Sequence, residues 1–218
     1  MTEAPQSSPT LNVQWLGLNK AYATTYDHMV QCLEQRVAQT IGNQLLLVEH
    51  QHTYTVGRHS GASTNVLMPG EVPVIEVSRG GDVTYHGNGQ LTGYPILQLP
   101  EHKRDLHAYL HFLEQFWIDQ LRKYDIHAER NSRNTGIWTN GKKIVALGIA
   151  CRRWVVWHGF ACNLSTDLRY FQRINPCGMS SELVTSMTEQ IENPPSLTAL
   201  VDDISMSFPL AYQDWIRK

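Results

Sequence analysis

The sequence predicts a single domain of the α/β or α+β class. With 218 residues, the chain is long enough for one sizeable core or for two small ones. Short apolar runs typical of strands alternate with stretches of helical periodicity. No internal repeat, low-complexity segment or linker interrupts the chain between Leu11 and Lys218. We therefore expect one folded domain over residues 11–218 and a disordered tail over the polar residues 1–10.

The composition argues against several classes of protein. A formal net charge of −2 shows no bias toward nucleic acid or membrane surfaces, and no apolar run is long enough to span a bilayer. Met1–Thr10 lacks the basic and apolar regions of a secretory signal. The four cysteines include no C-x-x-C pair, and no ligand spacing typical of zinc is present. These features favour the reducing cytoplasm and predict no structural metal.

The first part of the chain predicts several strands around one helix. Val13–Leu18 has the character of a strand, and a helix over about residues 20–42 follows. The apolar runs Leu45–Glu49 and Thr53–Val56 predict one irregular strand or a tight hairpin. Val72–Val77 predicts a further strand.

Two groups of side chains in this part are interpreted without a catalytic role. Tyr22 and Tyr26 lie on the apolar stripe of the expected helix, which favours core packing over a binding site. Arg58 and His59 follow the end of a strand, in a polar, turn-rich segment. We expect them to be solvated loop residues, although a position just past a strand end also suits a ligand contact.

The middle of the chain predicts a strand followed by a long helix. Leu91–Leu99 has strand character, with Pro95 tolerable at an edge or a bulge because proline cannot donate to a ladder. Asp105 is a good N-cap for a helix whose apolar face extends to Tyr124. This helix carries no evident chemistry.

The last part predicts a hairpin, one more long strand and a final helix. Asn140-Gly141 suits a type I′ turn, in which both central residues need a positive φ. Asn193-Pro194-Pro195 ends a brief helix, and Ser196 caps the final one. The expected elements are strands at Ile126–Arg130, Gly136–Thr139, Lys143–Ala150 and Val155–Leu164, and helical segments at Leu168–Phe171, Ser180–Met187 and 197–208.

The stretch Arg79–Pro95 contains five glycines between two apolar runs. So many glycines indicate either a sharply bent hairpin or a backbone that approaches a ligand closely. The G-x-G-x-x-x-G spacing of Gly87, Gly89 and Gly93 precedes a strand and does not match a dinucleotide fingerprint. No glycine-rich loop ends in Gly-Lys-Ser/Thr either, so the sequence gives no positive indication of nucleotide binding.

Cys177 is the best candidate for a nucleophile. Pro176 and Gly178 place it at a rigid corner where a thiol is accessible. A free thiol with a pKa of about 8.5 is mostly protonated near neutrality, so a base must activate it. The residues leave that base open; the candidates are His86, His158, Lys142 and Lys143. Alternation along a strand gives Lys142 and Lys143 opposite faces, one solvated and one inward.

A set of motifs in fixed order resembles one family over nearly the whole chain, from about Val13 to Phe208. The motifs are Arg-Gly-Gly-Asp-Val-Thr-Tyr-His-Gly at 79–87, Gly-Gln-Leu at 89–91, Gly-Tyr-Pro at 93–95, Gly-Lys-Lys-Ile at 141–144, Leu-Gly at 147–148, His-Gly-Phe-Ala at 158–161 and Asn-Pro-Cys-Gly at 175–178. They resemble the octanoyl-acyl-carrier-protein:protein N-octanoyltransferases, also called lipoate-protein ligase B. Asn88 departs from the family, which usually has proline there.

The resemblance implies a fold, a reaction and a site. The fold is α+β, a biotin/lipoyl-protein ligase-like single domain with mixed β-sheets flanked by helices. The reaction moves an octanoyl group from acyl carrier protein to a lysine of a lipoyl domain, such as those of 2-oxoacid dehydrogenases or the glycine-cleavage H protein. No cofactor, ATP or metal is implied. Cys177 matches the cysteine that carries the acyl group, and Lys143 matches the lysine that activates it.

The same resemblance implies an acyl-binding wall built from three segments. Small residues would make room for the chain, and Leu147 and Phe160 would line it. Backbone N–H groups near Leu147, Gly148 or Gly178 are candidates for the oxyanion site. The expected wall consists of Arg79, Gly80, Gly81, Asp82, Val83, Thr84, Tyr85, His86, Ala146, Leu147, Gly148, Gly159, Phe160 and Ala161.

Two alternatives belong to other functional classes. An ATP-dependent lipoate or biotin ligase shares the expected fold and needs no nucleophilic cysteine, and a non-catalytic lipoyl-binding protein would not depend on Cys177. The Asn-Pro-Cys-Gly motif favours the transferase over both. Arg58, Lys142, Arg152 and Arg153 are the cations expected to help dock an acidic carrier protein.

Overall fold

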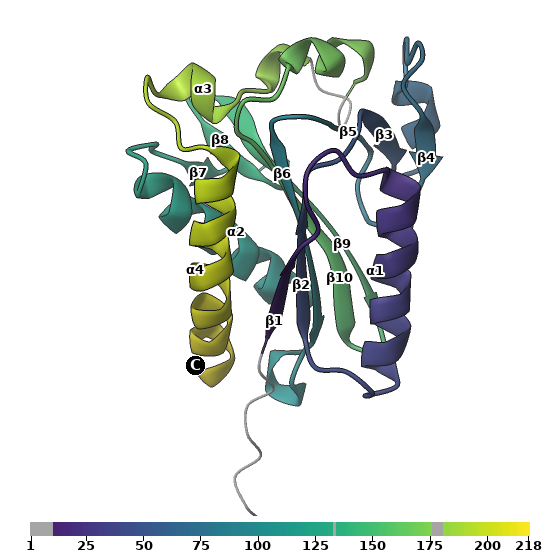
Figure 1. Ribbon diagram of the computed structural model, residues 1–218, viewed down its shortest axis with the longest axis vertical. Coiled ribbons are helices and arrows are strands. Elements are labelled where there is room, and N and C mark those ends of the chain that lie inside the picture. Colours follow the sequence, from purple (N-terminus) through teal and green to yellow (C-terminus); the bar gives the residue numbers. More distant parts are fainter. Residues whose placement is uncertain (1–10, 133, 176–180) are drawn as a thin grey trace, which may run out of the picture.

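The computed structural model describes residues 11–132, 134–175 and 181–218, which form two β-sheets with helices packed around them (Figure 1). The larger sheet has seven strands in the order β1-β2-β6-β10-β9-β8-β7. Its neighbouring strands are antiparallel except for the parallel pair β1 and β2. The strands are β1 (Asn12–Trp15), β2 (Gln44–Val48), β6 (Gln90–Gln98), β10 (Val155–Asn163), β9 (Lys142–Arg152), β8 (Ile137–Thr139) and β7 (Glu129–Arg130). This architecture confirms the expected α+β class.

The smaller sheet has the order β4-β3-β5, with β4 at Val74–Glu76, β3 at Thr53–Val56 and β5 at Val83–His86. The expectation that β2 and β3 form one strand or a hairpin is therefore wrong, because the two strands belong to different sheets. Between them the backbone N–H of Gln51 bonds the carbonyl of Lys20 at 2.9 Å, which turns the chain away from β2. Strand β5, inside the glycine-rich stretch, was not anticipated.

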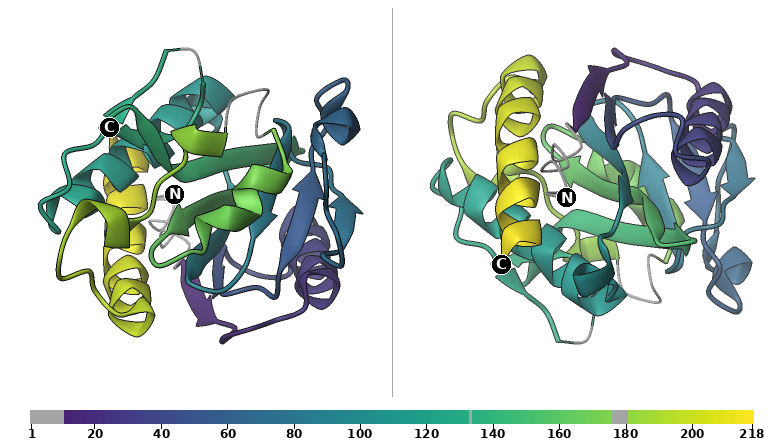
Figure 2. Two further views of the ribbon diagram at one scale, coloured as in Figure 1. Left: turned by 90° about the horizontal axis from the view of Figure 1, so that it is seen from above. Right: turned by 90° about the horizontal axis from the view of Figure 1, so that it is seen from below.

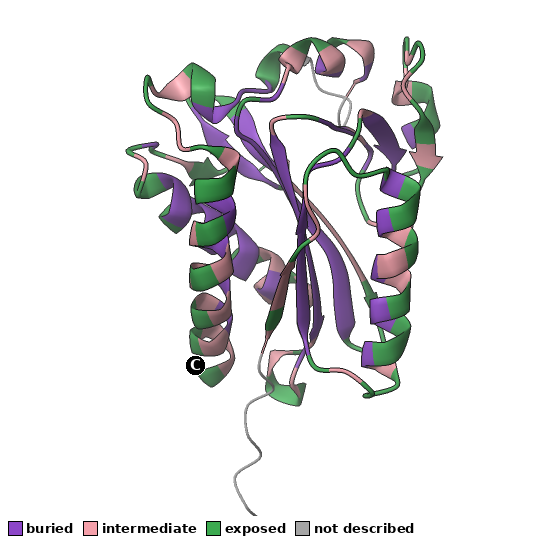
Figure 3. Cartoon of the chain, in the orientation of Figure 1, coloured by how far each residue is buried: buried purple, intermediate pink, exposed green. Residues whose placement is uncertain are grey.

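Helices cover both faces of the large sheet (Figures 1 and 2). Helix α1 (Tyr22–Val37) packs Met29 and Leu33 on one face, against Leu46 and Ile96. Helices α2 (Leu106–Arg122) and α4 (Leu197–Arg217) cover the opposite face, where most of the core lies. Figure 3 shows that the central strands are buried while the helices are buried along one side. Such one-sided burial is what an amphipathic stripe predicts.

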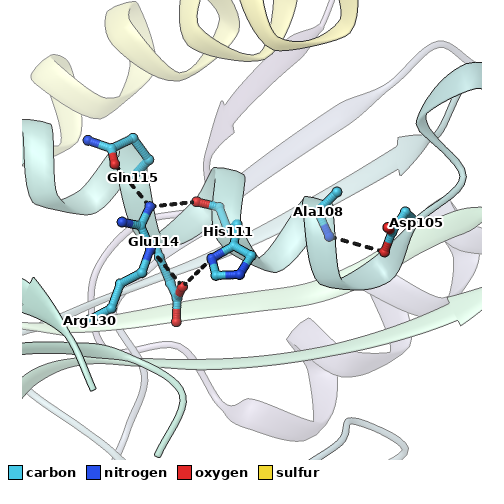
Figure 4. Close-up of polar contacts among 6 residues, drawn as sticks. All are labelled: Asp105, Ala108, His111, Glu114, Gln115 and Arg130. Atoms are coloured by element: carbon cyan, nitrogen blue, oxygen red, sulfur yellow. Dashed lines mark hydrogen bonds and ion pairs between the residues drawn. The ribbon is translucent and has the colours of Figure 1, made fainter. Parts of the chain in front are cut away.

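The start of α2 confirms the capping expectation. The Asp105 carboxylate accepts the backbone N–H groups of His107 at 2.8 Å and Ala108 at 3.1 Å (Figure 4). Further along the helix, the buried Glu114 accepts a hydrogen bond from Arg130 of β7 at 3.1 Å, which ties the β7 segment to α2. A cap of this kind typically contributes about 1 kcal/mol.

The hairpin of β8 and β9 also confirms its prediction. Asn140 and Gly141 have φ values of 49° and 74°, the positive values that a type I′ turn needs. The strand expected at Ile126–Arg130 shortens to β7, since it pairs with β8 at two positions. The remaining helical pieces are η1 (Ala62–Asn65), η2 (Glu101–Lys103), η3 (Leu168–Arg173), η5 (Ser181–Leu183) and α3 (Met187–Gln190).

Pro95 lies in a central strand, between β2 and β10, and not at an edge. The ladder of β6 with β10 is interrupted between the pairs Leu97/Val156 and Gly93/Phe160, and the register places His158 opposite Pro95. Because proline has no N–H, the facing carbonyl loses its donor and β10 need not keep strand geometry there. His158 takes a left-handed φ of 59°.

In the part of the chain that the structure describes, no helix is both long and apolar enough to cross a membrane. The disordered tail expected over residues 1–10 lies outside the described residues.

Candidate functional site

A cavity of about 460 Å³ opens beside the large sheet, a size within the usual range of small-molecule sites. Strands β6, β9 and β10 line it, together with segment 79–86, residues 134–135 and the first residue of α1. The glycine-rich stretch therefore forms part of a cavity wall as well as the connection between β4 and β6.

The cavity brings together most of the residues expected in the acyl-binding wall. Those that line it are Arg79, Gly80, Gly81, Asp82, Val83, Thr84, His86, Ala146, Leu147, Gly148, Gly159, Phe160 and Ala161. Tyr85 is the exception, because neighbouring residues of a strand point to opposite faces. Its ring stacks on Tyr170 at 4.8 Å, and its hydroxyl bonds His52 at 2.5 Å. Tyr85 thus packs under the small sheet.

Close backbone contacts hold the Arg79–Gly81 wall in place. The N–H of Gly80 donates to the carbonyl of Ile149 at 2.8 Å, so the wall pairs with β9. Arg79 donates to the carbonyl of Thr55 at 2.9 Å. A Cβ on Gly148 would lie 2.9 Å from Cδ of Arg79, so glycine at this position permits the approach. The wall is fixed by both sheets.

The cavity is elongated along β9. Its lining extends from Lys143 to Ile149 on this strand, which are six positions apart and therefore span about 20 Å at 3.3 Å per residue. Between these ends the sheet presents two pairs of small facing residues, Ala146 with Ala161 and Gly148 with Gly159. Small side chains on adjacent strands leave a channel that suits an extended, narrow ligand.

Lys143 lies at one end of this channel. Its side chain is 8 % exposed, and its ammonium donates to the side-chain oxygen of Asn134 and to the carbonyl of Thr135 at 2.9 Å. The ring of Trp138 lies 5.3 Å from the same nitrogen. Lys142 is exposed, as strand alternation requires. The inward lysine of the pair is therefore Lys143.

Residues on both sides of Cys177 are anchored to the rest of the fold, and those that follow it lie beside Lys143. The N–H of Asn175 donates to the carbonyl of Asn65 at 2.8 Å. Val184 lines the cavity and bridges to Lys143, and the N–H of Thr185 donates to the Lys143 carbonyl at 2.9 Å. Cys177 itself lies outside the described residues, as does Gly178.

At the other end of the channel, three uncharged rings line the cavity beside Arg79. Tyr22 and Tyr94 line it from α1 and β6, and His158 lines it from β10. Burial, together with the nearby cations Arg79 and Arg58, lowers the pKa of His158 to about 3. Burial raises the pKa of Tyr22 to about 12. Both side chains are therefore neutral near neutral pH.

Two more histidines lie near this end, and both are neutral. His50 bonds the Tyr94 hydroxyl at 2.7 Å, and burial lowers its pKa to about 4. His86 bonds Gln90 at 2.8 Å, and burial followed by the neighbouring His50 lowers its pKa well below the usual value. Of the candidate bases named from the sequence, His86, His158 and Lys143 line the cavity and Lys142 does not.

Sequence reasoning missed several lining residues. Tyr22 was expected in the core, and it is buried, yet its ring also faces the cavity because it begins α1. Asn134 was seen as part of a turn, and no local pattern marks it as a partner of Lys143. His59 is exposed, as expected, and it also lines the cavity, which the sequence left open. An apolar stripe or a turn does not reveal which distant segment it faces.

The expected docking cations lie in different places. Arg152 pairs with Glu34 of α1, and Arg153 lies in the turn after β9. Arg152 lies nine positions from Lys143 along β9, about 30 Å along the strand. Arg58 is exposed beside the Arg79 wall, with its N–H bonded to the Arg79 carbonyl at 3.0 Å.

No group of three histidine, cysteine or acidic side chains suited to a metal ion is found among the described residues. The three cysteines in this part of the chain, Cys32, Cys151 and Cys162, are unpaired.

Comparisons with known proteins give the family. Residues 21–209 match the family model described as the lipoyl protein ligase A/B catalytic domain. An octanoyltransferase of Geobacter metallireducens is 44% identical over 172 residues, covering 79% of this chain and 80% of the relative. An octanoyltransferase of Geobacter sp. strain M21 is 41% identical over 195 residues, covering 88% of this chain and 93% of the relative.

Solved structures agree on the fold. Lipoate-protein ligase A bound with ATP superposes with a TM-score of 0.67 at 13% identity, covering 97% of this chain and 93% of that one. Biotin protein ligase of Aquifex aeolicus, in complex with biotin and ATP, gives 0.55 at 11% identity, covering 95% and 71%. At such identities the likeness shows the fold alone. The sequence relatives and the family model go further: this chain belongs to the octanoyltransferase family of lipoyl protein ligase A/B catalytic domains.

Proposed function

We propose that this protein transfers an octanoyl group from acyl carrier protein to a lysine of a lipoyl domain, through a thioester on Cys177. The observation that carries the proposal is the channel itself: a narrow groove floored by alanine and glycine, with the buried amine of Lys143 at one end. A hydrocarbon chain of moderate length fits the groove, and a group that moves protons stands where its thioester would lie.

The reaction proceeds in two balanced steps. Lys143, in its neutral form, takes the proton of the Cys177 thiol, and the thiolate attacks the carbonyl carbon of the donor thioester. The bond from that carbon to the donor sulfur breaks, and the donor leaves as a thiol after taking the proton back. Exchanging one thioester for another is nearly balanced in free energy, so this step needs no nucleotide.

The second step forms the amide. The neutral amine of the acceptor lysine attacks the Cys177 thioester, the carbon–sulfur bond breaks, and the departing thiolate is reprotonated. Lys143 takes the proton that the attacking amine loses. Conversion of a thioester to an amide is downhill, which makes the transfer effectively one-way.

The oxyanion of each tetrahedral intermediate needs hydrogen-bond donors. Backbone N–H groups of Leu147, Gly148 or Gly178 are the proposed donors, and one such donor is typically worth about 3–4 kcal/mol. Leu147 and Gly148 border the cavity about 13–17 Å along β9 from Lys143. Gly178, which directly follows Cys177 in the sequence, is therefore the donor that the direction of the acyl chain favours.

The proposed partners and compartment follow from the same chemistry. The acceptors are lipoyl domains of 2-oxoacid dehydrogenase E2 subunits and the glycine-cleavage H protein. A thiol nucleophile and the unpaired Cys32, Cys151 and Cys162 suit the reducing cytoplasm. No cofactor or metal enters the proposed steps.

Intact-mass measurement tests the proposal directly. The purified protein is mixed with octanoyl-acyl carrier protein in the absence of ATP, and we expect an octanoyl adduct that Cys177→Ala abolishes. Addition of a lipoyl domain should discharge the adduct onto that domain. Absence of the adduct, or transfer that requires ATP, would reject the thioester mechanism and favour a ligase of the same fold.

A further inference from the structure

The distal end of the channel, opposite Lys143, changes abruptly in side-chain size. Along β10 the small lining residues Ala161 and Gly159 are followed by His158, while β6 contributes Thr92 and then Tyr94; Phe160, Asn163 and Gln90 also line the cavity. Two layers of small residues are thus followed by a layer of rings. A straight acyl chain that starts at Lys143 and runs along the strands meets these rings with its methyl end.

We propose that His158, Tyr22 and Tyr94 form a stop that sets the maximum length of the acyl chain. This inference rests on the proposed function for the direction in which the chain enters. It assigns a specificity role to three side chains that the expected acyl-binding wall did not include.

The backbone of β10 explains why a large ring occupies this position. In a regular strand, Trp157 and His158 would point to opposite faces of the sheet. Because His158 has a φ of 59°, its ring instead stacks on Trp157 at 4.3 Å and lies 6.0 Å from Tyr26 of α1. The interruption opposite Pro95 therefore turns His158 toward the cavity.

Hydrogen bonds and ring contacts make the stop rigid. His158 bonds the hydroxyl of Ser78 at 3.1 Å, and Ser78 directly precedes the Arg79 wall. Tyr94 bonds His50 at 2.7 Å, and the ring of Tyr22 lies 4.9 Å from that of His50. A side chain held by such contacts cannot rotate aside for a longer ligand without breaking them, so extra methylenes meet a fixed surface.

The left-handed backbone at position 158 offers a sharp test. In His158→Gly the ring is removed, and glycine adopts a φ of 59° without strain. Arg153→Gly is the matched control, because Arg153 has a φ of 51°, is exposed and does not line the cavity. Both substitutions replace a residue of positive φ by glycine and so remove the same kind of backbone strain. Only His158→Gly also opens the channel.

The experiment measures by calorimetry the binding of free hexanoate, octanoate, decanoate, dodecanoate and tetradecanoate. For the wild-type protein we expect affinity to rise about fourfold with each methylene and then to stop rising at a chain length within this series; this length is the break. In His158→Gly the break should move by about two to four carbons, because the ring volume becomes available. Arg153→Gly should keep the wild-type break.

Two results would overturn the stop: a wild-type affinity that keeps rising through tetradecanoate, or an unmoved break in folded His158→Gly. Tyr22→Leu provides a second opening from α1 if His158→Gly does not fold, and an unmoved break in that variant counts equally against the proposal. The proposal is also rejected if none of these acids binds the wild-type protein.

A transfer assay with acyl carrier proteins that carry acyl groups of these same lengths separates this inference from the proposed function. If the break moves in the binding assay but octanoyl-acyl carrier protein is not a donor, the stop stands and the proposed donor is wrong. If octanoyl transfer proceeds and neither binding nor transfer changes its length dependence in His158→Gly, the proposed function stands and the stop is wrong.

Discussion

The two ends of the channel are formed by different kinds of side chain. At one end Lys143 holds a buried amine against amide and carbonyl oxygens of residues 134–135, beside the anchored segment that contains Val184. At the other end, the rings of Tyr22, Tyr94 and His158 are all neutral near pH 7. The two proposals use this difference: the first end would move protons in the proposed mechanism, and the second end would limit the length of the acyl chain.

The largest expected effect belongs to the reactive end. Cys177→Ser should abolish octanoyl transfer almost completely, because an oxygen ester would replace the thioester. Lys143→Ala should lower the rate of acylation about 100- to 10,000-fold, the usual contribution of a general acid–base group. The matched control is Lys142→Ala, which removes an exposed neighbour and, with saturating donor so that docking does not limit the rate, should leave the rate close to wild type. Single-turnover acylation, followed by intact mass, measures all three.

His86→Ala tests whether Lys143 or a histidine is the base. His86 is buried and bonds Gln90, and its lowered pKa makes it a poor proton acceptor near neutrality. We expect a smaller loss than in Lys143→Ala. If His86→Ala were as damaging at unchanged stability, the base would have to be reassigned to histidine.

The second prediction is that the protein loses folding stability in acid because of the histidines near the ring-lined end of the channel. The pKa values of His50 and His158 are lowered in the fold to about 4 and about 3, from an ordinary value of 6.5. Between pH 6.5 and these values the unfolded chain binds protons that the folded one does not. Stability therefore falls with decreasing pH, by about 1.4 kcal/mol per pH unit for each such histidine.

Urea unfolding between pH 5 and 7 measures this slope. His158→Gly should reduce the slope of stability against pH by the contribution of one histidine, about 1.4 kcal/mol per pH unit. Replacement of the exposed His107 by Gln should leave the slope unchanged. An unaltered slope in His158→Gly would contradict the assignment of a buried neutral histidine at this end.

The third prediction concerns the floor between the two ends. In Gly148→Ala the new Cβ would lie 2.9 Å from Cδ of Arg79 and 3.3 Å from the Gly80 carbonyl. The wall must shift, at a cost of about 1–3 kcal/mol typical of overpacking, and octanoate should bind correspondingly more weakly. Calorimetry of octanoate binding checks this. Undiminished affinity in the folded variant would show that the wall does not contact the ligand.

The smallest expected effect lies outside both ends, at Asn88. The N–H of Gln90 bonds the carbonyl of Gly87 at 3.2 Å, which closes a turn with Asn88 in its second position and Gly89, at φ 75°, in its third. Asn88 has no positive φ, so the turn is of type II, which favours proline at that place. Asn88→Pro should stabilise the fold by about 0.4–1 kcal/mol.

Thermal or urea unfolding of Asn88→Pro gives the measurement. Because Asn88 is exposed and does not line the cavity, acyl-chain preference and transfer rate should stay at wild-type values. A loss of stability would mean that the turn is not of type II.

Local patterns predicted much of the fold for physical reasons that are themselves local. The Asp105 cap, the Asn140-Gly141 turn and the amphipathic helices depend on residues a few positions apart, and the structure has each of them. The pairing of strands was not predictable in the same way. β2 and β3 are adjacent in sequence yet join different sheets, because their partners come from distant segments.

The candidate site shows the same division. The ordered motifs indicated the family, the glycine-rich wall and the two small-residue segments of β9 and β10, since these features are written in consecutive residues. Only the tertiary structure placed Asn134 against Lys143 and turned His158 and Tyr22 toward one channel end. Those positions depend on strand register and on the missing N–H of Pro95, whose effect appears on a neighbouring strand more than sixty residues away.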